Sequence, residues 1–328
     1  MKATHPSKHQ ETMRAMAVTP KGVNMVEIPK PKPGQGKVRV KVIAAAINAA
    51  EDKIINRDFV GRFLHAKTKP LVLGWDFSGT VDALGEGVTD IELGADVSGL
   101  LAYTWTQNQG TFAEYITVPR NSVAIKPKNV SHNIAAAAPT VSLTSLQSLR
   151  DLAKLVKGDN VLIIGASGGV GSIAVGIAKR LGGHVTGVCS TKDMQQVKDL
   201  GADEIINRKE TAYIHSKAVY NVVFDTPAVL SYSLSEKSLK PGGHYITTLP
   251  NWALIVGMVR ALFSSKHCHF IQVTPQRADL ELINRWLSEG LEVPIDSHHK
   301  IANLTDALKR QTEQGRVGRV IVEVAGGW

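Results

Sequence analysis

Hydrophobic residues in the middle of the chain follow a strand, turn and helix pattern. Four apolar residues, 161–164, run into the glycine-rich turn 165–171, and residues 172–181 then take up helical spacing. A second β-like run, 184–189, follows, and a polar helix at 192–200 comes next. With a further β-like run at 204–207, this order predicts a βαβαβ mononucleotide-binding half in which the glycine turn binds a diphosphate at the positive end of a helix.

The glycines of this turn have separate roles in such a unit. Gly165 allows a tight turn, and Gly168 and Gly169 let a pyrophosphate approach the backbone. Gly171 lets the helix pack closely on the strand. The alternative interpretation is a glycine-tolerant turn that holds no ligand.

The hydrophobic pattern divides the chain into a part made of short strands and a part in which strands and helices alternate. Residues 13–18 and 22–28 predict paired strands, and residues 38–46 predict a strand entering a core. Further short strands up to residue 101 indicate a β-rich, barrel-like domain. From about residue 131, strands and longer helices alternate, which predicts an α/β domain with a doubly wound parallel sheet.

These predictions give domain boundaries. We expect residues 1–12 to be a disordered extension and residues 133–290 to form the dinucleotide-binding Rossmann domain. The other domain is discontinuous, with residues 13–132 and 291–328, because we expect a closing strand at 317–324 to return to it.

Two further stretches of the α/β part predict helices. Residues 142–155 predict one helix leading into the glycine-turn unit. Residues 252–263 form an apolar stretch of twelve residues that is interrupted by Arg260, and this is short of the roughly 20 residues that a membrane span needs. We therefore predict a packed helix there and no membrane span.

Composition and charge are compatible with the two predicted domains. The chain has 328 residues, 43% of them hydrophobic, with a formal charge of +9 and two cysteines, which favours a cytoplasmic protein without a disulfide framework. The amino terminus lacks the apolar segment of a secretory signal. Residues 1–42 hold nine basic and two acidic residues but no aromatic one, so we expect a solvated basic surface and no nucleic-acid partner.

Several motifs together resemble the medium-chain dehydrogenase/reductase superfamily, and within it the zinc-independent quinone oxidoreductase branch. The resemblance covers about residues 13–328 and rests on Asn48 and Asp52, 73–81 (LGWDFSGTV), 110–115 (GTFAEY), 143–145 (LTS), 166–171, 200–203 (LGAD) and 318–320 (GRV). It implies a GroES-like catalytic domain beside the Rossmann domain, and commonly a homodimer.

The residues argue against metal catalysis. Zinc-dependent relatives carry Gly-His-Glu where this chain has Gly74-Trp75-Asp76, and neither Cys189 nor Cys268 falls in the predicted catalytic domain. His267-Cys268-His269 resembles a metal motif, but alternating side chains on a strand point to opposite faces. We expect no metal there or at His298-His299.

The residues at the end of the second predicted strand, 184–189, indicate whether the cofactor is NAD or NADPH. An NAD site has Asp or Glu there, whereas this chain has Ser190 followed by Lys192. A hydroxyl and a cation suit a 2′-phosphate, so we predict NADPH. We assign Asp193 to the first turn of the next helix, where a carboxylate suits the helix dipole. Arg208 either contacts the adenine or phosphate or is a plain surface residue.

The resemblance adds contacts at the nicotinamide end, from Thr144 near a helix start and from Leu249 and Phe270 at the ends of later strands. The full set of predicted cofactor-binding residues is Thr144, Ser167, Gly168, Gly169, Val170, Ser190, Lys192, Arg208, Leu249 and Phe270.

Without a metal, a hydride from nicotinamide can reach an acceptor that is activated by conjugation. We therefore predict a small-molecule substrate, a quinone or an α,β-unsaturated carbonyl. The resemblance makes Asn48 a candidate to donate to its carbonyl or to hold the nicotinamide ribose; the alternative is an Asn that stabilises a turn. Tyr103 is the candidate donor to the developing oxyanion, or else lines a pocket wall. Trp75 and Trp105 either form an aromatic wall or pack in the interior.

Two other functions remain open at this point. A 2-enoyl thioester reductase would need a committed Tyr acid and basic residues for a carrier phosphate. An NADPH-binding sensor or scaffold would bind the cofactor without turnover, because no catalytic acid is unmistakable in this sequence.

Overall fold

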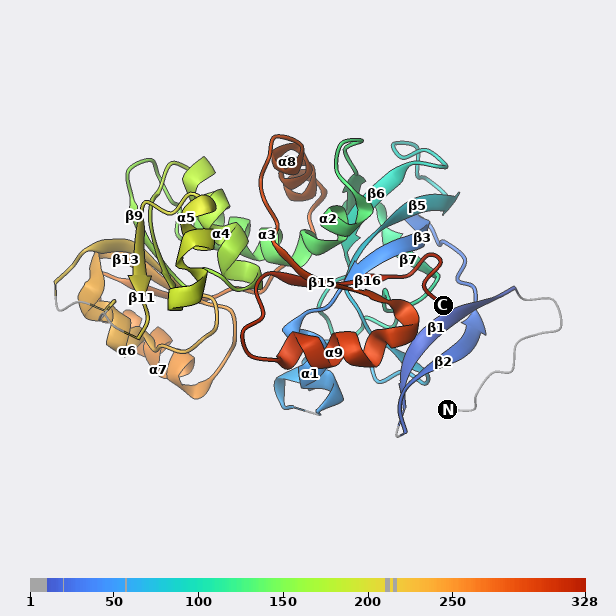
Figure 1. The fold of residues 1–328 in the computed structure, drawn as a ribbon, viewed down its shortest axis with the longest axis horizontal. Helices are drawn as coiled ribbons and strands as arrows, with labels where there is room; N and C mark the ends of the chain where they lie inside the picture. Colours follow the sequence, from blue (N-terminus) through green and yellow to red (C-terminus); the bar gives the residue numbers. More distant parts are fainter. Residues whose placement is uncertain (1–10, 20, 57, 210–212, 215–216) are drawn as a thin grey trace. The chain divides into compact units, whose positions relative to one another are not determined.

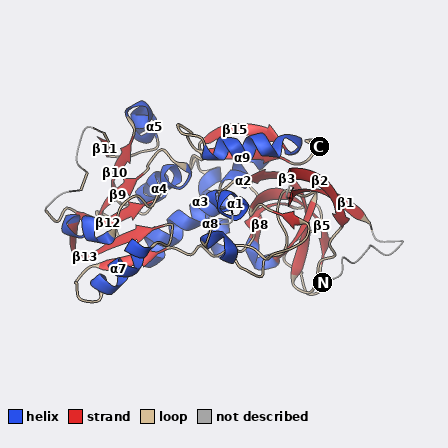
Figure 2. Cartoon of the chain, turned by 90° about the horizontal axis from the view of Figure 1, so that it is seen from below, coloured by secondary structure: helices blue, strands red, loops and turns tan. Residues whose placement is uncertain are grey.

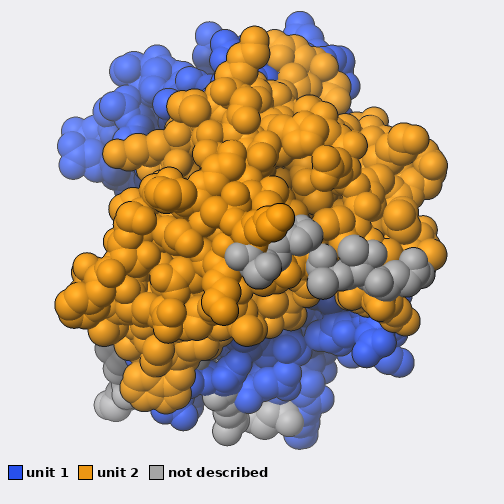
Figure 3. Space-filling model, turned by 90° about the vertical axis from the view of Figure 1, so that its left-hand side faces the viewer, with its two compact units in different colours: residues 1–140, 274–288, 295–328 blue, residues 141–273, 289–294 orange. Residues whose placement is uncertain are grey.

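The computed structural model describes residues 11–19, 21–56, 58–209, 213–214 and 217–328 (Figure 1). It divides into two compact units, coloured separately in Figure 3. The first unit comprises residues 1–140, 274–288 and 295–328, and the second comprises residues 141–273 and 289–294. The expected extension 1–12 lies mostly outside the described residues, but Thr12 already begins a strand.

The first unit is built on two sheets. A three-stranded sheet has the order β2-β1-β4, and a seven-stranded sheet has the order β15-β16-β3-β5-β6-β8 with β7 paired to β3. The strands are β1 Thr12–Thr19, β2 Gly22–Pro29, β3 Lys37–Ala46, β4 Leu71–Val72, β5 Asp76–Leu84, β6 Asp96–Leu100, β7 Tyr115–Pro119, β8 Val123–Ile125, β15 Ile295–Lys300 and β16 Arg319–Glu323. The predicted pairing of the first two strands is confirmed.

Strand β3 shows why this unit has a core. Val38, Val40 and Val42 alternate along it and are buried, because successive side chains of a strand point to opposite faces. The last strand, β16, pairs antiparallel with β3, so the end of the chain joins the sheet of its first residues. The helices of this unit are α1 Ala49–Ile55, α2 His132–Ala137, α8 Arg277–Ser288 and α9 Leu304–Thr312.

The second unit contains a six-stranded parallel sheet in the order β11-β10-β9-β12-β13-β14, with helices beside it (Figure 2). This is the predicted doubly wound α/β fold. Its strands are β9 Asn160–Ile164, β10 His184–Cys189, β11 Glu204–Asn207, β12 Tyr220–Asp225, β13 Leu239–Thr247 and β14 His267–Phe270. Its helices are α4 Gly169–Arg180, α5 Met194–Asp199, α6 Tyr232–Ser235 and α7 Trp252–Ala261, and α3 Pro139–Leu146 leads into it.

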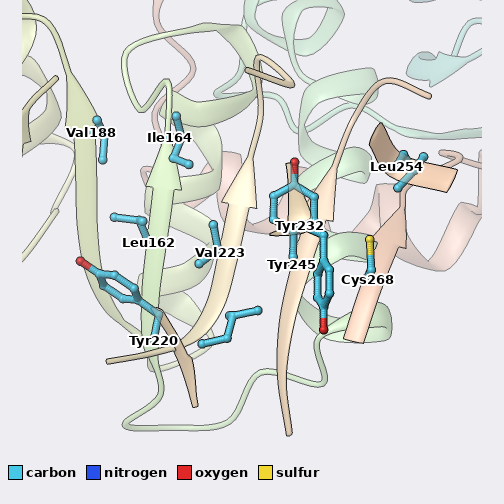
Figure 4. Packing of buried hydrophobic residues seen from close by; sticks show 10 residues of the cluster. Leu162, Ile164, Val188, Tyr220, Val223, Tyr232, Tyr245, Leu254 and Cys268 are labelled. Atoms are coloured by element: carbon cyan, nitrogen blue, oxygen red, sulfur yellow. The ribbon is translucent and has the colours of Figure 1, made fainter. Parts of the chain in front are cut away.

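The core of the second unit lies on this sheet. Leu162, Val223 and Tyr245 come from neighbouring strands and pack with Tyr232 and Leu254 from the helices (Figure 4). Aliphatic side chains of central strands are buried here, as a sheet covered by helices requires.

Two helices differ from the predictions. The single helix expected over 142–155 is α3 followed by a π-helix, Gln147–Leu152. The helix expected over 252–263 forms as α7, but it packs along one face only, because Leu254 and Gly257 are buried while most of its large apolar side chains are exposed. Apolar composition alone does not tell a covered helix from an uncovered one.

Candidate functional site

The glycine-rich turn joins β9 to α4. Gly165 has a φ of +73°, which favours glycine, and it turns the chain directly after the strand. A Cβ on Gly171 would lie 2.1 Å from the carbonyl oxygen of Gly165, so a side chain there would separate the helix from the strand. Both predicted roles agree with this geometry.

The amino-terminal end of α4 has no side-chain cap. Gly168 is the N-cap residue and makes no side-chain hydrogen bond to the helix, and Gly169 and Val170 are the first helical residues. The first N–H groups of a helix have no partner within it, and their dipole favours an anion. The twelve-residue helix α4 therefore offers a place for a phosphate group.

Helix α3 is tied to this turn. The Ser145 hydroxyl donates to the carbonyl oxygens of Val141 (2.7 Å) and Val170 (3.4 Å). Thr144, the neighbouring predicted contact, was expected near the start of a helix. It is buried and lies near the end of α3 instead. It lies one residue from the group that contacts the glycine turn.

A carboxylate links the glycine turn to the loop after β10. Asp193 Oδ2 accepts hydrogen bonds from the hydroxyls of Ser190 (2.6 Å) and Ser167 (3.0 Å). The sequence predicts Asp193 in the first turn of the next helix, but Asp193 is the N-cap residue that precedes α5, and its side chain makes no cap hydrogen bond there. Sequence reasoning missed this network, since nothing in the spacing of 167 and 193 indicates contact.

Two cations flank the same loops at the carboxyl ends of β10 and β11. Lys192 lies in the 3₁₀ turn Thr191–Asp193, and Arg208 directly follows β11; both are exposed. The Arg208 N–H donates to the Cys189 carbonyl oxygen (2.9 Å). Burial and the nearby Asp193 carboxylate raise the pKa of the Cys189 thiol to about 11, and Arg208 opposes this rise. Ser190, Lys192 and Arg208 therefore belong to one edge of the sheet.

The two remaining predicted contacts lie along the same sheet. Phe270 is the last residue of β14 and pairs with Thr247, the last residue of β13. Leu249 lies two residues after Thr247 in the chain. Both side chains are half-buried. The carboxyl ends of parallel strands form the ligand-binding edge of such a sheet.

Asp225, at the end of β12, is a further group that the sequence did not reveal. Its carboxylate accepts from the N–H groups of Val229 (3.2 Å) and Leu230 (2.7 Å) and from the Tyr245 hydroxyl (3.0 Å). Burial raises its pKa, and these hydrogen bonds oppose the rise. The side chain therefore fixes the loop after β12.

In the first unit, the candidate residue Asn48 lies in a buried polar cluster. Its Nδ2 donates to Asp76 Oδ2 (2.9 Å), and its Oδ1 accepts from Arg319 Nη2 (2.9 Å). Arg319 Nη2 also donates to Asp76 Oδ2 (2.8 Å), and the Thr140 N–H donates to Asp76 Oδ1 (2.6 Å). Asn48 is 5% exposed, and its amide nitrogen carries a second hydrogen besides the one donated to Asp76.

Glu51 borders this cluster and is fully buried. One carboxylate oxygen accepts from the Asn48 N–H (2.9 Å), and the other, Oε1, has no hydrogen-bond partner. Burial raises the pKa of Glu51 from 4.5 to about 8, with the nearby Asp76 adding to the effect. Glu51 is therefore mainly protonated at neutral pH.

Tyr103, the other candidate, stacks on Trp75 with ring centroids 4.8 Å apart. Its hydroxyl lies 3.0 Å from the Thr140 hydroxyl, so Thr140 touches both Tyr103 and Asp76. Burial raises the pKa of Tyr103 well above 10, and Asp76 and Glu51 add to this rise. Trp75 is fully buried and packs in the interior, whereas Trp105 is exposed.

Three histidine side chains from β13 and β14 lie together. His267 and His269 lie on the same face, because residues two apart on a strand do, and His244 of β13 stacks with both. His244 Nδ1 is 3.0 Å from His269 Nε2. Even so, across the described part of the chain no three His, Cys, Asp or Glu side chains are placed to hold a metal ion.

The chain is similar in sequence to known dehydrogenases and oxidoreductases. One family model, the alcohol dehydrogenase GroES-like domain, matches residues 34–128, and another, zinc-binding dehydrogenase, matches residues 200–322. A chloroplast envelope quinone oxidoreductase homolog from Arabidopsis thaliana is 30% identical over 314 residues, 92% of this chain and 94% of the relative. The chain belongs to the medium-chain dehydrogenase/reductase superfamily, in its quinone oxidoreductase branch.

Other members extend the comparison. Trans-enoyl reductase pgmF from Aspergillus terreus is 28% identical over 320 residues, 90% of this chain and 88% of the relative. The solved structure of the quinone oxidoreductase from Coxiella burnetii is 25% identical in sequence and has a TM-score of 0.81. The match covers 96% of this chain and 100% of that one. The protein is thus an oxidoreductase of a superfamily that binds NAD(P)(H).

The residues of the second unit fit that cofactor. An uncapped helix end behind a turn closed by Gly165 and Gly171 suits a diphosphate. The side chains that this chain carries at the position of the zinc ligands of zinc-dependent relatives do not fit zinc, although one matching family is called zinc-binding dehydrogenase. At the Gly-His-Glu position this chain places Trp75, which is buried against Tyr103, and Asp76, which is bound by Arg319.

Proposed function

We propose that this oxidoreductase uses NADPH to reduce a quinone or an α,β-unsaturated carbonyl compound, without a metal ion. The observation that carries the proposal is the grouping of Ser190, Lys192 and Arg208 at the carboxyl ends of β10 and β11. Two cations and a hydroxyl are a suitable environment for a 2′-phosphate.

Asp193 is the group that opposes this assignment. A carboxylate at this edge normally favours NAD, because it accepts from the ribose 2′-hydroxyl. Here the same carboxylate oxygen already accepts from Ser167 and Ser190. We infer that Asp193 orients these two hydroxyls and that Lys192 and Arg208 provide the charge that the phosphate needs.

The other predicted residues would hold the remainder of the cofactor. Gly168, Gly169 and Val170 would bind the diphosphate through backbone N–H groups. Thr144, Leu249 and Phe270 would contact the nicotinamide end. The bound cofactor supplies a hydride, and the protein supplies orientation and hydrogen-bond donors.

In the first unit, Asn48 and Tyr103 would act on the acceptor. The second amide hydrogen of Asn48 would donate to the acceptor carbonyl, while Asp76 and Arg319 hold the side chain in place. Tyr103 keeps its proton because its pKa is raised, so its hydroxyl is a donor and not a base. Both groups would stabilise negative charge developing on oxygen.

The test is the oxidation of NADPH, followed by absorbance, with a panel of quinones, enones and saturated ketones. We expect NADPH consumption with conjugated acceptors only. Turnover of saturated ketones would contradict the proposal. Tight NADPH binding with no consumption on any acceptor would instead support a sensor or scaffold.

A 2-enoyl thioester reductase is the second candidate, and the Aspergillus trans-enoyl reductase is the reason to test it. Enoyl thioesters belong in the same panel, with the variant Tyr103→Phe beside the wild type. If enoyl thioesters are the best substrates and Tyr103→Phe abolishes their reduction, this second function replaces the first.

Assembly and location are also part of the proposal. We propose a homodimer in the cytoplasm, whereas the relative from Arabidopsis is named for the chloroplast envelope. Light scattering of the purified protein gives its mass, and a tagged copy of the chain shows its compartment.

A further inference from the structure

Asn48 and Tyr103, the candidate donors to the acceptor, lie on two different segments of the first unit. Asn48 begins the segment 48–66 as the N-cap residue of α1. Tyr103 lies in the loop 101–110, between β6 and β7. The other side chains of these two segments are therefore the ones placed to contact the part of the acceptor that does not react.

The two segments are joined to each other. The Ala66 N–H donates to the Gln107 carbonyl oxygen (2.7 Å). His65 is buried, and one of its ring nitrogens is 3.1 Å from the Gln109 carbonyl oxygen. The same ring meets Trp75 edge to face, with ring centroids 6.0 Å apart, and Trp75 also stacks on the second segment. The two segments therefore lie side by side.

The exposed aromatic side chains of the first unit are confined to these segments. Phe59 is 70% exposed, Phe63 is 55% exposed and Trp105 is 71% exposed. Across the part of the first unit that the structure describes, the other Phe, Tyr and Trp side chains are buried or half-buried. Scattered apolar residues on a surface need no explanation, but a group beside candidate catalytic residues points to a ligand. We call Phe59, Phe63 and Trp105 the aromatic rim.

Phe59 and Phe63 are held in place by the turn that carries them. Their rings meet edge to face, with centroids 5.5 Å apart. The 3₁₀ turn that ends at Phe63 packs closely on α1, because a Cβ on Gly61 would be 2.5 Å from the Lys53 carbonyl oxygen. Lys53 itself pairs with Asp58 (3.2 Å). The two rings thus form an apolar surface on a fixed turn.

We propose that the aromatic rim binds an uncharged hydrocarbon tail of the acceptor, so that the preferred substrates are conjugated carbonyl compounds with such a tail. This inference rests on the proposed function, because it concerns the same site. Asn48 and Tyr103 would contact the carbonyl oxygen, and the rim would cover the tail. Each methylene group that the rim removes from water strengthens binding.

Size and location favour this occupant over a protein partner. Three partly exposed aromatic side chains bury less than the about 800 Å² that each partner contributes to a stable protein interface. The rim also lies on the segments that carry Asn48 and Tyr103, and the acceptor is the molecule that these two residues would contact. A tail of that molecule is therefore the occupant that fits.

The test is a series of straight-chain methyl ketone enones with tails from methyl to heptyl, which share one reacting group. With NADPH and the wild type, we expect kcat/KM to rise at least about tenfold along the series. In the double variant Phe59→Ser, Phe63→Ser the rise should be at most about threefold, mainly because KM for the long enones is higher. Trp105→Ser, on the other segment, should also reduce the rise.

The matched control is the double variant Met25→Ser, Leu93→Ser, which removes two exposed apolar side chains elsewhere in the first unit. It should keep the wild-type dependence on tail length. All substituted side chains are exposed, so thermal unfolding should agree with that of the wild type. If the phenylalanine double variant does not fold, Trp105→Ser decides the test.

Dissociation constants of the same enones, measured by calorimetry with the oxidised cofactor, separate this inference from the proposed function. If no enone is reduced, the proposed function fails, but tighter binding of long tails that is lost in the rim variants would still support the rim. A series that is flat in the wild type overturns the inference. An equally steep series in the wild type and the rim variants also overturns it, because the tail would then bind elsewhere.

Discussion

At the scale of single residues, the structure gives two acidic side chains roles that their positions in the sequence do not reveal. Asp193 accepts two serine hydroxyls beside the proposed phosphate site, and Glu51 is buried with one oxygen unpartnered. The pairs Ser167–Asp193 and Asn48–Arg319 are far apart in the chain. Local patterns predicted Ser190 and Asn48 as site residues but could not reveal these partners.

Asp193→Asn tests the charge balance of the proposed cofactor site. Asparagine keeps an oxygen that can accept both hydroxyls, and it removes a negative charge that repels a 2′-phosphate. We expect the ratio of NADH to NADPH dissociation constants to rise about tenfold, measured by calorimetry. Asp199→Asn is the control, because Asp199 is exposed on α5 and its carboxylate contacts Gln195. An unchanged ratio in Asp193→Asn would show that this carboxylate does not face the phosphate.

Glu51→Gln tests the buried carboxyl group. The folded protein holds the Glu51 proton up to a pKa of about 8, against 4.5 ordinarily, so unfolding releases a proton between these values. The free energy of unfolding of the wild type should therefore fall as pH rises from about 5 to about 8, by on the order of 4 kcal/mol from this group. Glu51→Gln should lose this contribution in denaturant titrations, whereas the exposed Glu92→Gln should keep it. Parallel curves for Glu51→Gln and wild type would mean that Glu51 titrates normally.

At the scale of elements, the turn between β9 and α4 was predictable because its requirements are local. A glycine spacing after an apolar strand indicates the turn, and the structure shows why Gly171 cannot carry a side chain. Helix α7 was not predictable in the same way. Its apolar run correctly indicates a helix, but whether another element covers it depends on distant parts of the fold.

Gly171→Ala tests the turn. The added Cβ would press on the Gly165 carbonyl oxygen, so we expect a loss of about 1–3 kcal/mol in the free energy of unfolding, the usual effect of overpacking. Dinucleotide binding should weaken with it. Gly34→Ala is the control, because a Cβ there meets nothing within 4 Å. Normal stability and normal binding in Gly171→Ala would contradict the close packing of α4 on β9.

At the scale of the whole molecule, the chain closes on itself through its last strand. β16 pairs with β3, and Arg319 at its start reaches Asp76 and Asn48, more than 240 positions earlier in the sequence. The return of this strand was predictable from its pattern and from the family resemblance. The buried ion pair that comes with it was not, because a lone Arg at a strand start predicts no partner.

Arg319→Ala tests this closure. Removing one partner leaves the Asp76 charge buried and unpaired, so we expect a loss of about 3–5 kcal/mol in the free energy of unfolding. The exposed Arg285→Ala on α8 should change stability little. If the two variants are equally stable in denaturant titrations, the Arg319–Asp76 pair does not contribute as described.

The central claim is that NADPH reduces a conjugated acceptor in a site without a metal. The most direct measurement is kcat/KM for NADPH and for NADH with one quinone, on protein treated with a chelator. We predict at least about a tenfold preference for NADPH and the same rate before and after chelation. A preference for NADH, or activity lost with the chelator and restored by zinc, would contradict it.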